Sequence, residues 1–176
     1  MDEDEPLDSR LTERQNPRSM RIDQLSTIDI VDLINAEDAG VAAAVAQERQ
    51  PIARAIDLVV AAFERGGRLI YVGAGTSGRL GVLDASEMPP TYGADPELVQ
   101  GIMAGGFGAL LRGQEGAEDD RSGAVKAIDE KAVCEKDFVL GIAASGTTPF
   151  VHAALQRARA GCEDGLPALH LSHAGT

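Results

Sequence analysis

The sequence predicts an α/β fold, in which a doubly wound parallel sheet carries helices on both faces. The clearest observation is the run 138–143, FVLGIA, which is apolar without alternation, as expected of a strand covered on both sides. A second is that further strand-like runs, 68–72, 98–104 and 168–172, alternate with helical patterns over short connections. Such alternation favours right-handed parallel crossovers, and ligands of these sheets bind beyond the carboxyl ends of the strands.

The N-terminal part is expected to hold an arm and then helices. Residues 1–20 combine many charges with few apolar side chains, which predicts a mobile or docking arm, and residues 21–176 are expected to form one domain. Ser26 followed by Asp29 is typical of a capping box that opens a short amphipathic helix. Asn35 is then expected to cap a second helical stretch.

Apolar residues recur at helical spacing from residue 41 to residue 63. Pro51 interrupts this pattern, and it either starts a new helix or kinks one. Gly66 and Gly67 are expected to end the helix before the strand 68–72.

The rest of the chain repeats a strand, a polar turn and a helix. The turn 73–78 leads into a helix that carries Arg79 and Asp84, and a polar, acidic stretch, 113–123, follows the strand 98–104. Helices are predicted over about 122–133 and over 150–160, on either side of the strand 138–143 and the turn 144–149.

Composition restricts the partners of the protein. The net charge of −12 over 176 residues argues against nucleic acid and anionic membranes, because both reward clustered Lys and Arg. Cys134 and Cys162 support neither a disulfide framework nor a zinc site and are expected to be small buried side chains. The N-terminus lacks the pattern of a signal peptide, and no apolar run reaches the length of a membrane span, so the cytoplasm is the expected compartment.

Two turns, GAGTSG (73–78) and ASGTTP (144–149), predict a site for an anionic small molecule. A strand that enters a helix through a tight turn brings unpaired amides and a positive dipole end to one point, which suits a phosphate. Both turns should lie on the same edge of the sheet. Their hydroxyls could then converge on one ligand; the candidates are Thr76, Ser77, Ser145, Thr147 and Thr148, with backbone amides near Gly78 and Gly146.

Other interpretations of these turns are weaker or remain open. GAGTSG resembles a dinucleotide fingerprint, but the strand that follows it ends without the acidic residue that binds a ribose. No Gly-Lys-Ser/Thr of a Walker loop is present. Taken singly, each Ser/Thr turn could simply cap a helix. Arg79 could contact the ligand or form a salt bridge outward, and the three histidines give no convincing metal site.

Four stretches of the chain together resemble N-acetylmuramic acid 6-phosphate etherases, members of the sugar isomerase (SIS) fold group. They are residues 16–38, 67–93, 114–120 and 139–151, and the resemblance extends over residues 12–160. The elements DASE-x-PPT (84–91) and EGAED (115–119) separate these etherases from generic sugar isomerases. The resemblance implies an SIS-type, flavodoxin-like sheet preceded by N-terminal helices.

The resemblance implies a lyase that removes D-lactate from N-acetylmuramic acid 6-phosphate to give N-acetylglucosamine 6-phosphate during recycling of cell-wall sugars. It assigns the acid and the base to Glu87 and Glu118, with Glu87 as the general acid and Glu118 as the base that takes the C2 proton, although the roles could be exchanged. Such a reaction needs one ionised and one protonated carboxyl group, and neither a metal nor a cofactor. The seven residues Thr76, Ser77, Gly78, Ser145, Gly146, Thr147 and Thr148 are expected to bind the substrate.

The resemblance also implies a homodimer whose active site draws on the neighbouring subunit, with the helices between residues 41 and 63 as candidate interface. Two positions depart from many relatives, which carry Arg in place of Thr147 and Cys in place of Met88. Family chains continue past the fourth strand, so the chain is expected to be truncated and to leave a sheet edge exposed. Two other functions remain open, a sugar-phosphate isomerase and a non-catalytic sugar-phosphate-binding regulator of the same fold.

Overall fold

The computed structural model describes residues 14–161 and 168–172, with side chains up to residue 161. The chain divides into two compact units, and the boundary falls between Arg54 and Ala55. The predicted arm lies largely outside the described residues.

The first unit contains the 3-10 helix η2 (Ile22–Gln24), the helix α1 (Thr27–Gln47) and the start of α2 (Arg49–Glu64). The predicted cap is confirmed, because the Ser26 hydroxyl accepts the Asp29 amide proton at 3.3 Å. The predicted helix start at Asn35 is wrong, since α1 passes through Asn35 without a break. One Asn inside a helix costs only a fraction of a kcal/mol (about 0.7 or less), and the alanines around it favour the helix.

The helix α2 crosses the boundary between the units. Pro51 lies in its first turn, where the missing amide proton of proline is not needed. The helix ends at Glu64, and Gly66 follows with a φ of 74°, a backbone conformation that glycine adopts without strain. The predicted stop at Gly66 and Gly67 is therefore confirmed.

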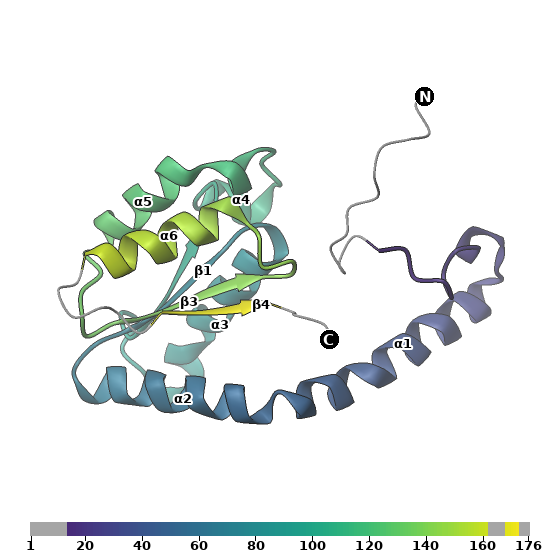
Figure 1. Ribbon diagram of the computed structural model, residues 1–176, viewed down its shortest axis with the longest axis horizontal. Helices are drawn as coiled ribbons and strands as arrows, with labels where there is room; N and C mark the ends of the chain where they lie inside the picture. The colour runs from purple at the N-terminus through teal and green to yellow at the C-terminus, as the bar shows by residue number, and fades with distance from the viewer. Residues whose placement is uncertain (1–13, 162–167, 173–176) are drawn as a thin grey trace. The chain divides into compact units, whose positions relative to one another are not determined.

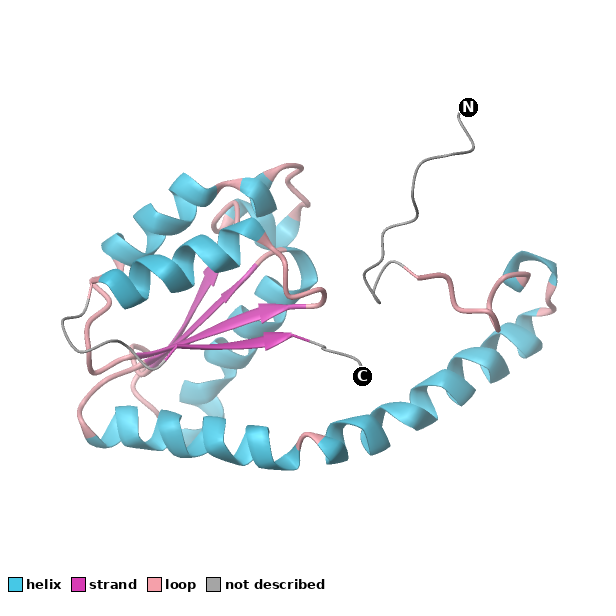
Figure 2. Cartoon of the chain, in the orientation of Figure 1, coloured by secondary structure: helices cyan, strands magenta, loops and turns pink. Residues whose placement is uncertain are grey.

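The second unit is built on a parallel sheet of four strands, as Figures 1 and 2 show. They are β1 (Leu69–Gly73), β2 (Val99–Met103), β3 (Phe138–Ala143) and β4 (Ala168–Ser172), in the spatial order β2-β1-β3-β4. The chain moves outward from β1 to β2 and then returns past β1 to β3. The strand order therefore reverses between β1 and β3, which is the point where flavodoxin-like sheets bind ligands. The predicted fold class is confirmed.

Helices cover both faces of this sheet (Figure 1). On one face α5 (Arg121–Glu130) and α6 (Pro149–Ala160) pack over a core that includes Ile70, Val139 and Val151. On the other, α3 (Gly75–Tyr92) and the end of α2 pack over a smaller cluster. Its buried members are Ala62, Leu69, Val99 and Phe138. The short helix α4 (Gly108–Leu111) and the 3-10 helix η3 (Ala117–Asp119) follow β2. Helix η3 lies inside the predicted polar stretch 113–123, and α4 lies just before it, where no helix was predicted.

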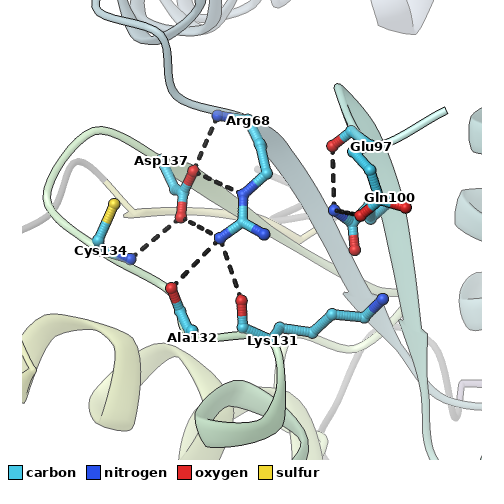
Figure 3. A network of polar contacts seen from close by, with 7 residues as sticks. All are labelled: Arg68, Glu97, Gln100, Lys131, Ala132, Cys134 and Asp137. Carbon is cyan, nitrogen blue, oxygen red and sulfur yellow. Dashed lines mark hydrogen bonds and ion pairs between the residues drawn. The ribbon is translucent and has the colours of Figure 1, made fainter. Parts of the chain in front are cut away.

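A buried ion pair fixes the start of β1 to the connection between α5 and β3 (Figure 3). Arg68 donates to both carboxylate oxygens of Asp137, at 3.0 Å from Nε and 2.7 Å from Nη2. Asp137 also accepts the amide protons of Arg68 and Cys134, at 2.8 and 3.0 Å. Nη2 of Arg68 completes the network at the carbonyls of Lys131 and Ala132.

These contacts decide the charge state of Asp137, whose side chain is only 1% exposed. Burial by itself would raise the pKa of this carboxyl group, but hydrogen bonds from Arg68 and from the Cys134 amide, with the Arg68 charge, lower the pKa below its ordinary value. Asp137 therefore stays ionised and paired in the folded protein.

Candidate active site

The turn between β1 and α3 forms the first half of the candidate site. The helix begins at Gly75 rather than after Gly78, so Thr76 and Ser77 lie in its first turn. A Cβ atom on Gly78 would lie 2.7 Å from the Gly73 carbonyl oxygen, which is why strand and helix can approach so closely only with glycine here. The Gly78 amide already donates to the Ala74 carbonyl at 3.1 Å. The amides that point out of the helix start are those of Gly75, Thr76 and Ser77.

The turn between β3 and α6 forms the second half. Gly146 has a φ of 73°. Its carbonyl oxygen forms a hydrogen bond with Nε2 of His152 at 2.7 Å, so His152 helps to stabilise the turn. The hydroxyls of Ser145 and Thr147 are 2.8 Å apart, and the Thr147 amide donates to Ser145 at 3.3 Å. These bonds give the turn a defined shape.

Neither helix start is capped by a side chain. The N-cap residue of α3 is Ala74, which has no side-chain oxygen, and Thr148 at the N-cap of α6 makes no capping hydrogen bond. The simple alternative for these turns, that their hydroxyls are helix caps, is therefore not what the structure shows.

The two turns lie side by side, as predicted. Strands β1 and β3 are hydrogen-bonded and parallel, and Gly73 at the end of β1 is paired with Ile142 near the end of β3. Both turns consequently leave the sheet at the same edge, at the point where the strand order reverses.

A cavity of about 350 Å³ connects the first turn with the acidic stretch that follows β2. Glu118 lies at this cavity together with Ala74 and Gly75. Its short helix η3 is anchored through Ala117, which packs against the main core. The cavity is lined by Ala74, Gly75, Arg79, Met103, Ala104, Ala109, Gly113, Gln114, Glu115, Gly116, Ala117 and Glu118.

The acidic residues around Glu118 do not share one role. Asp120 caps α5 by accepting the Gly123 amide proton and the Ser122 hydroxyl proton, both at 2.8 Å. The hydrogen bond from Gly123, followed by that from Ser122, lowers the pKa of Asp120. Asp120 is thus accounted for by the helix start, whereas Glu115 and Glu118 face the cavity.

Glu87 lies elsewhere in the same chain. It is exposed on α3, twelve residues after Gly75, so the helical rise separates the two positions by about 18 Å. Glu87 is absent from the described lining of the cavity. Within one chain, therefore, the structure brings Glu118 to the first turn but does not bring Glu87 there.

The orientation of α3 is fixed by its contact with β1. A Cβ atom on Gly81 would lie 2.8 Å from that of Tyr71, so the helix passes directly over the strand. The Tyr71 hydroxyl donates to the Asp84 carboxylate at 2.7 Å. Burial, then this hydrogen bond and the Asp84 charge, raise the pKa of Tyr71 far above its usual range.

Arg79 has a role that sequence reasoning missed. Its Nε donates to the Leu110 carbonyl at 3.1 Å and its Nη2 to the Ala109 carbonyl at 2.7 Å. The side chain thus holds the end of α4 at the cavity instead of pairing outward. No sequence pattern signals this contact, because α4 has only four residues.

Cys134 is a free cysteine and is half-buried, more exposed than expected. His170 lies in β4, whose side chains are not described, and Cys162 and His173 fall outside the described residues. Among the helices that the structure describes, none is long and apolar enough to cross a membrane.

A flavodoxin-like parallel sheet with two glycine- and hydroxyl-rich turns at its reversal point has the architecture of an SIS domain. Residues 51–159 match the family model described as the glucokinase regulatory protein N-terminal SIS domain. The chain therefore belongs to the SIS-domain family. It is also similar to proteins named N-acetylmuramic acid 6-phosphate etherase.

Three curated relatives named N-acetylmuramic acid 6-phosphate etherase illustrate this similarity. The protein from Crocosphaera subtropica is 56% identical over 149 residues, which are 85% of this chain and 49% of the relative. The protein from Rippkaea orientalis is 53% identical over 159 residues, 90% and 52% of the two chains. The protein from Edwardsiella ictaluri is 56% identical over 153 residues, which are 87% of this chain and 51% of the relative. The chain spans about half the length of these relatives.

Proposed function

We propose that this chain takes part in releasing D-lactate from N-acetylmuramic acid 6-phosphate, with N-acetylglucosamine 6-phosphate as the sugar product. The observation that carries the proposal is the cavity in which Glu118 and the turn after β1 lie together. The names of the relatives support the choice of substrate. A phosphorylated sugar does not cross membranes unaided, so the reaction belongs in the cytoplasm.

The phosphate is assigned to the two turns. Amides at the start of α3 and the hydroxyls of Thr76 and Ser77 approach it from one side, with Gly78 permitting the close turn. Ser145, Gly146, Thr147 and Thr148 approach it from the other. Uncapped helix starts at neighbouring strand ends support this assignment, since backbone amides and helix dipoles can bind a dianion without lysine.

The chemistry is assigned to two carboxyl groups. Once the sugar ring opens to its aldehyde, the C2 hydrogen is acidic, and the Glu118 carboxylate takes that proton. The C3–O bond then breaks, and Glu87 gives its proton to the ether oxygen, which leaves as the hydroxyl of D-lactate. Water then adds to the unsaturated aldehyde: the Glu87 carboxylate takes one proton from the water as its oxygen bonds to C3, and Glu118 returns its proton to C2. This gives the product sugar and restores both carboxyl groups.

The position of Glu87 supports a homodimer. Because Glu87 and Glu118 lie apart in one chain, we assign the Glu87 that completes each site to a second copy. Leu83 and Leu80 lie one and two turns before Glu87 on the same side of α3, and each is 57% exposed. An apolar patch beside a functional carboxylate is what an interface between two copies requires.

The experiment that tests this function follows D-lactate released by the purified chain. N-acetylmuramic acid 6-phosphate should yield lactate and N-acetylglucosamine 6-phosphate in equal amounts. N-acetylmuramic acid without the phosphate should react at least about 100-fold more slowly, because it loses the charge-assisted hydrogen bonds at both turns. Equal rates for the two sugars would contradict the phosphate assignment, and the absence of any lactate would contradict the activity.

A second candidate rests on the match to the SIS domain of a regulatory protein. A regulator would bind sugar phosphates without converting them. The same measurement decides between the two, because binding of N-acetylmuramic acid 6-phosphate without lactate release would favour the regulator.

A further inference from the structure

The cavity is lined by more negative than positive side chains, and this imbalance affects which ligands it can bind. Two carboxylates, Glu115 and Glu118, lie at the cavity, and Arg79 is the one cation among the described residues that line it. A second anion that entered this space would be repelled by both glutamates. It could be accommodated only beside Arg79.

The guanidinium group of Arg79 is held in place for such a contact. Its bonds to the carbonyls of Ala109 and Leu110 use Nε and one hydrogen of Nη2. A guanidinium group has five N–H donors in a fixed plane, so these two bonds orient the group without exhausting it. The side chain is half-buried, which reduces screening by water.

The substrate of the proposed function carries two anions, and the turns account for only one of them. The phosphate is at C6, and the carboxylate of the D-lactyl group is at C3, on the far side of the sugar ring. Gly75 in the turn after β1 lines the same cavity as Arg79 and Glu118, so both side chains are available to the other groups of a sugar whose phosphate is bound at that turn.

We propose that Arg79 determines specificity by binding the carboxylate of the D-lactyl group. This inference rests on the proposed function. A guanidinium group matches a carboxylate with paired N–H donors, and its charge offsets the repulsion from Glu115 and Glu118. It distinguishes the lactyl sugar from its product, which has the same phosphate but lacks that carboxylate.

The test compares the binding of two ligands by calorimetry. Every protein carries Glu87→Gln, which keeps the size of the side chain and blocks conversion, and the ligands are N-acetylmuramic acid 6-phosphate and N-acetylglucosamine 6-phosphate. Arg79→Met should weaken binding of the lactyl sugar by about 10- to 100-fold, as expected for charge-assisted hydrogen bonds, and binding of the product sugar by less than about 2-fold. Arg79→Lys should recover part of the loss.

The control is Arg112→Met, which removes an exposed arginine just after α4 that does not line the cavity. It should leave both affinities unchanged. An equal loss for both ligands in Arg79→Met would show a purely structural role and overturn the inference, as would no loss for either. If the protein with intact Arg79 binds neither ligand, the proposed function fails, and the inference fails with it.

Discussion

Glu118→Gln is expected to lower the rate of D-lactate release by about 10²- to 10⁴-fold, the usual contribution of a general base. The change keeps the size of the side chain and removes only its ability to take a proton. Because Glu118 lies on a short helix anchored through Ala117, the surrounding structure should stay intact. The measurement is the steady-state rate with N-acetylmuramic acid 6-phosphate, with the substrate KM determined alongside.

The matched control for this variant is Glu135→Gln. Glu135 is also an exposed glutamate, but it precedes β3 and lies outside the described lining of the cavity. It should retain the wild-type rate. Full activity in Glu118→Gln would remove this residue from the mechanism, whatever the control does.

Asp137→Ala is expected to lower the free energy of unfolding by about 3–5 kcal/mol, because it leaves the Arg68 guanidinium without its buried partner. The same change removes the acceptor for two backbone amides, those of Arg68 and Cys134. Urea unfolding followed by circular dichroism at pH 7 measures the loss.

Asp129→Ala is the control for burial. Asp129 pairs with Arg157 at the same N–O distance, 2.7 Å, but the two side chains are 46% and 40% exposed. The free energy of unfolding should fall by less than about 1 kcal/mol in Asp129→Ala. Equal effects of the two changes would mean that burial of the Arg68–Asp137 pair does not matter.

Acidification gives a second check on Asp137. The pKa of Asp137 is lowered in the folded protein. Its contribution to the stability of the fold is therefore complete above the pKa of the unfolded state, about 3.9, and is lost as the pH falls through the pKa of the folded state. The stability difference between wild type and Asp137→Ala should therefore be full at pH 7 and shrink below about pH 4. A difference that grows on acidification would contradict the assigned charge state.

The sequence was sufficient for the parts of the fold that repeat a strong pattern. The unbroken apolar run FVLGIA predicted β3 with its correct bounds, and Ser26 with Asp29 predicted the start of α1. The pairing of two polar turns at one sheet edge followed from the rules of parallel sheets and is confirmed by the register of β1 and β3.

The sequence could not predict features that depend on very short helices or on the distance between residues far apart in the chain. Helix α4 and the 3-10 helix η3 are too short, and have too many glycines around them, to show a helical period in the sequence. The hydrogen bond from Arg79 to the end of α4 could therefore not be predicted. Similarly, the separation of Glu87 from Glu118 appears only once α3 is seen to start at Gly75 and to run unbroken past Glu87.

The central claim is that Glu118 of one chain and Glu87 of a second copy act on the same sugar phosphate. The most direct test is to co-express Glu87→Gln and Glu118→Gln chains with different affinity tags and to purify the mixed assembly. In a two-fold dimer one of its two sites has both glutamates intact, so the mixed assembly should release D-lactate at about half the wild-type rate, although each parent is nearly inactive. A mixed assembly as inactive as its parents would contradict the claim.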